Sequence, residues 1–206
     1  MLTVWGRINS INVQKVLWTL AELGVTCHRI DAGMKFGVND TAAYRAMNPN
    51  GLVPAIDDDG YVLWESNAIV RYLAAKHGSG TLYPEDLPAR FHAERWMDWQ
   101  ATTFNNAISP LFVGLIRTAP EKRDPAALDQ ARQKCEACLA ILDAHLADRP
   151  FMNGESFTMA DIPVAATVNR WYLLPVERTP RPHAERWLAA LAARPAFAAH
   201  LTTPLS

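Results

Sequence analysis

Short apolar runs and one longer amphipathic stretch alternate at the start of the chain. Leu2–Trp5 and Cys27–Ile30 have the length and composition of strands. Between them, apolar side chains recur every three or four residues from Asn12 onward, and Gly24 follows the last of these positions. This spacing predicts a helix that ends near Gly24, so the first thirty residues or so form a strand, a helix and a second strand.

The pattern then changes to a predicted hairpin and a further helix. Val53–Ile56 and Tyr61–Trp64 are two strand-like runs, and Asp57–Gly60 between them supplies turn residues. From Ser66 the apolar positions return to helical spacing, which ends at Gly78. These segments predict a hairpin that leads directly into a helix.

A short helix at Thr41–Met47, after a loop at Gly33–Asp40, completes the first half of the chain. The predicted order is β-α-β-α-β-β-α, which is the order of a thioredoxin-like domain. We therefore assign residues 1–78 to a thioredoxin-like domain and residues 79–88, which are rich in turn residues, to a linker.

Strand signals disappear after the linker, and residues 89–206 are predicted to form an all-helical domain. The fold class is therefore α+β. Pro110 lies inside the first predicted helix and is expected to kink or end it. The predicted helices are Arg90–Arg117, Ala126–Ala147, Ala160–Leu173, Ala184–Ala193 and a short one after Pro195.

Two motifs in the helical half are interpreted as structural. Thr158 and Asp161 have the spacing of a capping box in which Asp replaces Glu or Gln. Cys135 and Cys138 form a Cys-x-x-Cys pair, but they lie inside a long helical pattern and not at a helix start after a strand. We interpret them as small, partly buried side chains one turn apart.

Composition excludes several classes of function. The net charge of −1 at pH 7 shows no basic surface for nucleic acid or for an anionic membrane. No apolar run approaches the roughly 20 residues of a membrane span, and the first residues lead into a strand, which predicts a cytoplasmic protein. Three cysteines suit a reducing compartment, and the six histidines show no ligand spacing, so no metal is predicted.

Residues 48–78 carry the most specific motif. Pro54 stands at the mouth of a predicted strand, where a proline cannot donate to the ladder, and Ser66 stands at a helix N-terminus, which attracts carboxylates. Each residue alone is commoner as a turn proline or a helix cap. Together with Val53 and Glu65, their order closely resembles the glutathione-binding half of the cytosolic glutathione S-transferases.

This resemblance implies that glutathione is the cosubstrate. In the family the proline is cis, and the residue before it pairs its backbone with the cysteinyl unit of glutathione; here these are Pro54 and Val53. The Glu-Ser pair of the family holds the γ-glutamyl end, which implies Glu65 and Ser66. The Thr158–Asp161 stretch also resembles the capping box of the family's helical domain.

The loop after the first strand supplies the candidate catalytic residues. It aligns without gaps on the loop that carries the catalytic serine in theta-, delta- and zeta-like transferases, and the serine falls at Ser10. The nu-like bacterial enzymes use Thr and Asn two residues apart, which correspond to Ser10 and Asn12. The structural alternative for either residue is a helix cap. As catalytic residues, they would donate hydrogen bonds to the glutathione thiolate.

The chain departs from the family pattern in two places. Its first loop has no cysteine, unlike the omega, beta and glutaredoxin-like members, and Trp5-Gly6 stands where mammalian alpha, mu and pi enzymes have Tyr. Where many relatives hold the glycyl carboxylate with His, Gln or Lys, this chain offers Asn39, with Lys35 as the alternative.

The electrophilic second substrate is expected against the helical domain. Arg117 either orients a substrate carboxylate or favours its helix C-terminus. The apolar candidates, for each of which core packing is the structural alternative, are Phe112, Leu115, Ile116 and Trp171.

Three functions remain open from the sequence. The first is a glutathione transferase that adds the thiolate to a small electrophile. The second is a glutathione-dependent disulfide reductase or isomerase on the same site, and the third is a non-catalytic interaction module of the same fold. The resemblance also implies a two-fold homodimer that packs the first domain of one subunit on the helical domain of the other.

Overall fold

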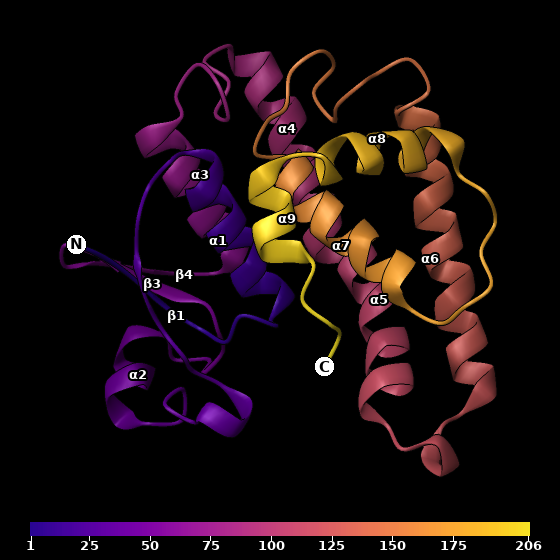
Figure 1. Cartoon of the computed structure of the whole chain (residues 1–206), viewed down its shortest axis with the longest axis horizontal. Coiled ribbons are helices and arrows are strands. Elements are labelled where there is room, and N and C mark those ends of the chain that lie inside the picture. Colours follow the sequence, from indigo (N-terminus) through magenta and orange to yellow (C-terminus); the bar gives the residue numbers. More distant parts are fainter.

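The computed structural model describes all 206 residues, and its four strands form one mixed sheet at one end of the molecule (Figure 1). The strand order is β2-β1-β3-β4. The central strand β1 (Leu2–Trp5) pairs parallel with β2 (His28–Ile30) and antiparallel with β3 (Ala55–Asp58). β3 in turn pairs antiparallel with β4 (Tyr61–Trp64).

Helices lie on both sides of this sheet. α1 (Ile11–Glu22) and α3 (Ser66–His77) pack on one side, and α2 (Ala42–Met47) lies on the other side (Figure 1). Val4 and Ile56 are direct cross-strand partners, and both are fully buried against α1 and α3. The predicted thioredoxin-like order of elements is confirmed, with an added 3-10 turn in the loop before α2.

The hairpin between β3 and β4 differs from the prediction at its start. The strand begins at Ala55, two residues later than expected, because the preceding proline has no N–H to donate to the ladder. It continues through Asp57 and Asp58, so the turn contains only Asp59 and Gly60. Both turn residues have positive φ, 51° and 93°, as a two-residue hairpin turn requires.

The helical half begins with a single long helical path. It runs through α4 (Leu87–Trp99) and α5 (Asn105–Phe112), with π-helical segments at Gln100–Phe104 and Val113–Arg117. Its second part, from Asn105 to Arg117, is called the α5 path below. We expected Pro110 either to kink or to end its helix; it lies inside α5, and the helix does not end there. The remaining helices are α6 (Pro125–His145), α7 (Asp161–Leu173), α8 (Pro182–Ala192) and α9 (Pro195–Leu201), with a 3-10 turn at Pro120–Lys122. None of the helices has the length and apolar character needed to cross a membrane.

α1 joins the two halves of the molecule. One face packs on the sheet, while Trp18 on the other face lies 5.1 Å from the ring of Phe197 on α9. Near its C-terminus, Glu22 accepts an ion-paired hydrogen bond of 2.6 Å from Arg194. α1 therefore lies at the seam between the sheet and the helices. The domain division at residues 79–88 stays a prediction; this stretch lies mainly between α3 and α4.

Candidate functional site

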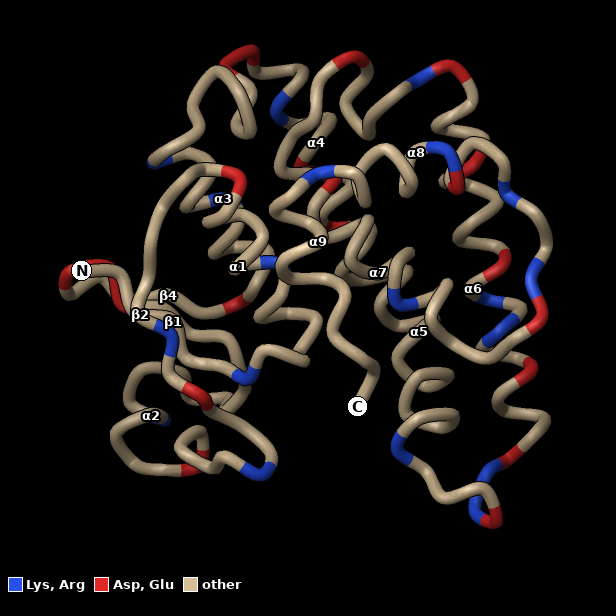
Figure 2. The backbone as a smooth tube through the Cα atoms, viewed as in Figure 1, with Lys and Arg blue, Asp and Glu red and all other residues tan.

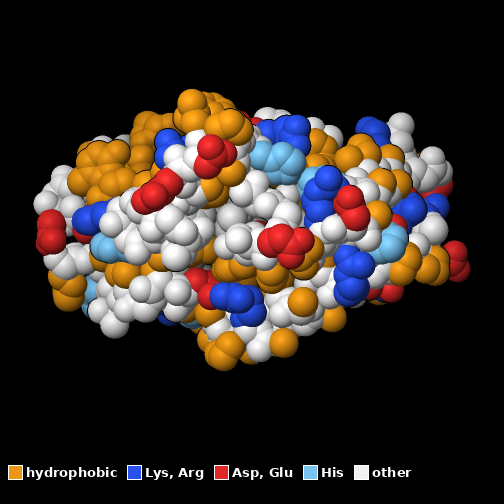
Figure 3. Space-filling model, turned by 90° about the horizontal axis from the view of Figure 1, so that it is seen from above, with side chains coloured by type: hydrophobic (Ala, Val, Ile, Leu, Met, Phe, Trp, Pro, Cys, Tyr) orange, Lys and Arg blue, Asp and Glu red, His pale blue; other side chains and the backbone are white.

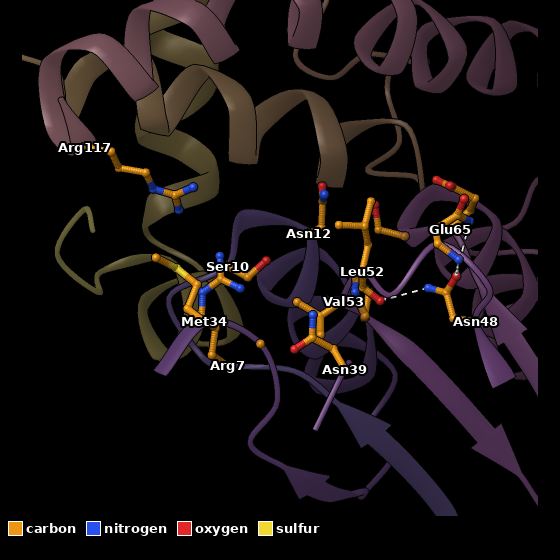
Figure 4. Close-up of a pocket in the computed structure, with 14 residues that line it drawn as sticks. Arg7, Ser10, Asn12, Met34, Asn39, Asn48, Leu52, Val53, Glu65 and Arg117 are labelled. Carbon is orange, nitrogen blue, oxygen red and sulfur yellow. Dashed lines mark hydrogen bonds between the residues drawn. The ribbon is translucent and has the colours of Figure 1, made fainter. Parts of the chain in front are cut away.

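A cavity of about 340 Å³ lies where the loop after β1, the segment before β3 and the N-terminus of α3 meet the end of the α5 path (Figure 4). Polar side chains dominate its lining. The structure brings together in this one cavity all seven of the site residues predicted from the sequence: Ser10, Asn12, Asn39, Val53, Pro54, Glu65 and Ser66.

Ser10 occupies the N-cap position of α1 without acting as a side-chain cap. Its backbone is extended (φ −82°, ψ 121°) and its carbonyl accepts from the N–H of Gln14 at 2.8 Å. Its hydroxyl makes no capping hydrogen bond, although that bond is the usual reason for a serine at this position. The hydroxyl therefore stays available to a ligand, beside the free N–H groups of the first turn of α1.

Asn12 lies in the first turn of the same helix and is partly exposed to the cavity. In Figure 4 its side chain points from the loop toward the helical half of the molecule, away from Val53. Ser10 and Asn12 thus present a hydroxyl and an amide from one helix N-terminus, where the helix dipole favours negative charge.

The segment before β3 is held by its neighbours but leaves one residue unpaired. The carbonyl of Leu52 accepts from the hydroxyl of Tyr44 at 2.7 Å and from the amide of Asn48 at 2.8 Å. Burial raises the pKa of Tyr44 to about 12, so this hydroxyl remains a donor. Val53 makes no backbone hydrogen bond in the protein, and its bond to Pro54 is cis, as predicted. Val53 therefore offers a free donor and acceptor to an extended peptide.

Glu65 and Ser66 mark the start of α3, as predicted. Glu65 is the N-cap, its side chain is exposed, and its φ of 70° is unusual for a residue with a side chain. Such a conformation costs on the order of 1–3 kcal/mol and is common at ligand sites. Ser66, only 7% exposed, follows at the first helical position. The open N-terminus of α3 thus combines a carboxylate, a hydroxyl and free N–H groups.

The two candidates for the glycyl carboxylate differ in position. Asn39 lines the cavity, but its amide donates to the carbonyl of Gly51 at 2.6 Å and so also holds the loop. Lys35 does not line the cavity, and its ammonium lies 5.2 Å from the ring of Phe36. Of the two, only Asn39 is placed to contact a ligand in this cavity.

The apolar candidates for the second substrate are mostly core residues. Phe112 and Trp171 are 3% and 1% exposed, and the partly buried Leu115 and Ile116 pack against the same core. None of the four lines this cavity, and their packing in or against the core fits the structural alternative; a contact with a second substrate stays an untested prediction. Arg117 does line it.

Sequence reasoning missed Arg7, which lines the cavity beside Ser10. Its position in the first loop was a signal, since that loop already carried the other candidates.

The structure does not bring together three His, Cys, Asp or Glu side chains that could hold a metal ion.

Comparison with known families identifies both halves of the chain. A family model described as the N-terminal domain of glutathione S-transferase matches residues 1–75, and one described as the C-terminal domain matches residues 125–201. Glutathione S-transferase GstB of Escherichia coli is 46% identical, with complete coverage of both chains. Glutathione S-transferase 3 of Zea mays is 34% identical over 95% of this chain and 91% of its own length.

Solved structures show the same similarity. The theta class glutathione S-transferase of Xanthomonas axonopodis pv. citri, crystallised with glutathione bound, superposes with a TM-score of 0.96. It is 45% identical, and the match covers 100% of this chain and 99% of the other. A glutathione transferase of Burkholderia graminis with two glutathione molecules bound per subunit has a TM-score of 0.86 at 27% identity, covering 98% of this chain and 88% of the other.

Proposed function

The chain belongs to the glutathione S-transferase family, and we propose that its cavity binds glutathione and stabilises the thiolate for attack on a small electrophile. The observation that carries this proposal is the uncommitted hydroxyl of Ser10, which shares one cavity with the unpaired backbone of Val53 and the open N-terminus of α3. Each of these three features offers groups that a tripeptide thiol can use.

The groups match the parts of glutathione. The carboxylate of Glu65 suits the ammonium of the γ-glutamyl unit, while Ser66 and the N–H groups of α3 suit its carboxylate. The free N–H and C=O of Val53 suit the cysteinyl backbone. Asn39 is the proposed contact for the glycyl end, and Pro54 lines the cavity beside Val53.

The chemistry that the enzyme supplies is stabilisation of an anion. A free thiol with a pKa near 8.5 is only a few per cent ionised at neutral pH. A hydrogen bond to a charged group contributes roughly 1.5–3 kcal/mol, which corresponds to about one to two pKa units. Donation from Ser10, supported by Asn12 and the N–H groups of α1, is therefore enough to make most of the bound thiol ionised near pH 7.

No specific observation favours disulfide reduction through a protein cysteine. Cys135 and Cys138 are buried in α6, and burial raises the pKa of Cys135 to about 12. Cys27 lies next to β2 and does not line the cavity. A disulfide reaction at this site would have to use glutathione alone.

The proposal is tested by steady-state assays of glutathione with 1-chloro-2,4-dinitrobenzene and, separately, with bis(2-hydroxyethyl) disulfide. We expect conjugation of the aryl halide to dominate. Glu65→Gln should raise the KM for glutathione by about tenfold or more, because it removes the charge partner of the γ-glutamyl ammonium. Glu85→Gln is the matched control at an exposed carboxylate outside the cavity. Dominant disulfide reduction, or no activity with either substrate, contradicts the proposal.

The proposal extends to assembly and location. Exposed apolar side chains in both halves support a homodimer, since Leu52 beside the cavity is 65% exposed and Phe91 on α4 is 60% exposed. Light scattering at micromolar concentration should therefore give the mass of two chains. Three free cysteines support a reducing, cytoplasmic location.

A further inference from the structure

Three arginines gather at one end of the cavity. Arg7 from the loop after β1 and Arg117 from the end of the α5 path both line it. Arg170 on α7 stands behind them, with its guanidinium carbon 4.1 Å from the ring centre of Phe112. The guanidinium of Arg117 lies 4.8 Å from the same ring, so one aromatic side chain supports two of the three cations.

No Asp or Glu side chain neutralises this cluster. None of the three arginines forms an ion pair, whereas Arg71 and Arg194, for example, each contact an acidic side chain. Figure 2 shows basic positions on the loop after β1, on α7 and at the end of the α5 path. The face seen in Figure 3 instead carries acidic and basic side chains intermingled.

The three charges act on one another. Burial, and then the neighbouring charge of Arg117, lower the pKa of Arg7. Burial followed by the charges of Arg117 and Arg7 lowers the pKa of Arg170 to about 10. A guanidinium group is not deprotonated at neutral pH, so this mutual repulsion persists in the folded protein. An anion placed among them relieves this repulsion, so the cluster favours a negatively charged ligand.

The surroundings of Arg7 and Arg117 leave room for such a ligand. At Gly33, a side-chain carbon would lie only 3.1 Å from Nη1 of Arg7, so the glycine admits the guanidinium at this edge of the cavity. The Nε of Arg7 is buried and has no partner. One Nη of Arg117 already donates at 3.0 Å to a main-chain oxygen of Ser206, the last residue of the sequence, and its other donors are left for a ligand oxygen.

The position of the cluster relative to Ser10 distinguishes it from the glutathione contacts. In Figure 4, Arg117 projects toward Arg7 and Ser10, while Glu65 lies at the far end of the cavity. A glutathione held at Glu65 with its sulfur at Ser10 thus leaves the arginines beyond the sulfur. A second substrate that meets the sulfur from that side would lie against the arginines.

We propose that the electrophilic substrate of this enzyme carries an anionic group, such as a carboxylate, which Arg7 and Arg117 bind while the electrophilic carbon faces the thiolate. Arg170 is a positioning residue that holds Arg117 through the shared ring of Phe112. This inference rests on the proposed transferase function and adds the class of its substrate.

The reaction balances without any further reactant. For an aryl chloride, the thiolate sulfur forms a bond to the ring carbon, and the carbon–chlorine bond breaks as chloride leaves with the electron pair. The thiol proton has already passed to water. The arginines neutralise the carboxylate and orient the ring, and no oxidation or reduction takes place.

A matched pair of substrates tests the inference: 4-chloro-3-nitrobenzoate and 4-chloro-3-nitrobenzamide, which differ in the charge of one group. Each kcat/KM is divided by the uncatalysed rate constant with glutathione, because the two rings differ in intrinsic reactivity. We expect the wild-type enzyme to prefer the benzoate by about tenfold or more. Arg117→Met should raise the KM for the benzoate by a similar factor and leave the KM values for the benzamide and glutathione within about twofold.

Two further variants sharpen the test. Arg117→Lys keeps the charge but loses the planar fork, so it should recover part of the preference. Arg132→Met removes an arginine on α6 that pairs with Asp129 outside the cavity. It should change the KM for neither the benzoate nor the benzamide. An equal loss of kcat/KM for the benzoate and the benzamide in Arg117→Met would overturn the inference. So would a rise in the KM for glutathione, because the cluster would then hold its glycyl carboxylate.

A binding measurement separates failure of the inference from failure of the transferase assignment. The probes are 3-nitrobenzoate and 3-nitrobenzamide, which lack the leaving group, titrated into enzyme saturated with S-methylglutathione. Tighter binding of the benzoate, lost in Arg117→Met, supports the inference even if neither chloride is conjugated. Equal binding of both probes overturns it.

Discussion

The ammonium of Lys15 on α1 lies 3.2 Å from the side-chain oxygen of Gln100, which is 85 residues further along the chain. Lys15 is 3% exposed, and its ammonium also donates to the side chain of Asn67 at 3.3 Å. Gln100 continues the network to the hydroxyl of Thr167 at 2.9 Å. These bonds connect α1 and α3, whose N-termini line the cavity, to the helical half of the molecule.

Burial is the main cause that lowers the pKa of Lys15, to about 7, and the positive charge of Arg170 lowers it further. The carboxylate of Glu65 acts in the opposite direction. In the unfolded chain this lysine titrates near its usual value of 10.5. Between these two pH values the unfolded state therefore holds a proton that the folded state lacks.

The stability of the protein should rise with pH from about 7 toward 10.5 because of Lys15. Below about 7 the lysine is charged in both states and its contribution no longer changes. The slope from this one group is at most about 1.4 kcal/mol per pH unit. Lys15→Met should flatten the curve, measured by urea unfolding at several pH values in that window.

Lys134→Met, at an exposed lysine on α6, is the control and should keep the wild-type slope. Because other groups also titrate in this range, the informative quantity is the difference between the wild-type and Lys15→Met slopes. Parallel curves would show that Lys15 is not buried in its neutral form.

Asp161 at the start of α7 is predicted to be essential for folding. It is fully buried, and its carboxylate accepts from the N–H groups of Met152 at 2.9 Å and Thr158 at 2.8 Å and from the indole of Trp187 at 2.9 Å. Asp161→Ala leaves three buried donors without acceptors, and each costs about 1–3 kcal/mol. Chemical unfolding should therefore show that the free energy of unfolding falls by about 3 kcal/mol or more.

Asp129→Ala serves as the comparison, since that carboxylate is exposed on α6 and pairs only with neighbours on its own helix. The free energy of unfolding of Asp129→Ala should stay within about 0.5 kcal/mol of the wild-type value. A similar, small loss in both variants would mean that water or a rearranged loop satisfies the donors around Asp161.

Periodicity in the sequence predicted the elements of the fold well, because apolar spacing reflects burial directly. It was less successful where packing outweighs a local rule. Pro110 was expected to kink or end its helix, yet the helical path continues to Arg117. Ile108 and Leu111 beside it are almost fully buried, and burial of that face supplies more free energy than one missing backbone hydrogen bond.

The cavity residues fall into two groups by how far they could be predicted. Val53, Pro54, Glu65 and Ser66 lie within one short stretch, so a motif could identify them together, and the structure brings them into one cavity. The arginine cluster could not be predicted in this way. Arg7, Arg117 and Arg170 come from the loop after β1, the α5 path and α7, and they meet only because the helical half packs against α1.

Burial also could not be judged from residue type. Trp171 and Phe112 are aromatic and lie on helices near the cavity, which made them reasonable substrate contacts. Both turn inward to the core instead, and Phe112 affects the cavity through the two guanidiniums against its ring. Which face of a helix is buried depends on the neighbouring helices, and a single amphipathic pattern does not identify them.

Ser10→Ala distinguishes a catalytic hydroxyl from a helix cap. If Ser10 donates to the thiolate, the variant loses one charge-assisted bond, and the pKa of the bound thiol should rise by about one to two units. Affinity for glutathione should change far less, because the contacts proposed for Val53, Glu65 and Ser66 do not involve this hydroxyl. Since the hydroxyl caps nothing in the structure, stability should also change by less than the roughly 1 kcal/mol of a lost cap.

The measurement is a titration of thiolate absorbance in the glutathione complexes of the wild type and of Ser10→Ala, accompanied by thermal unfolding of both proteins. Ser109→Ala, on α5 and outside the cavity, controls for the loss of a serine hydroxyl at a partly buried position. An unchanged thiol pKa with a lowered melting temperature would reject Ser10 as the donor. Asn12 would then be the remaining side-chain donor at the start of α1, and a raised thiol pKa in Asn12→Ala would assign the role to its amide.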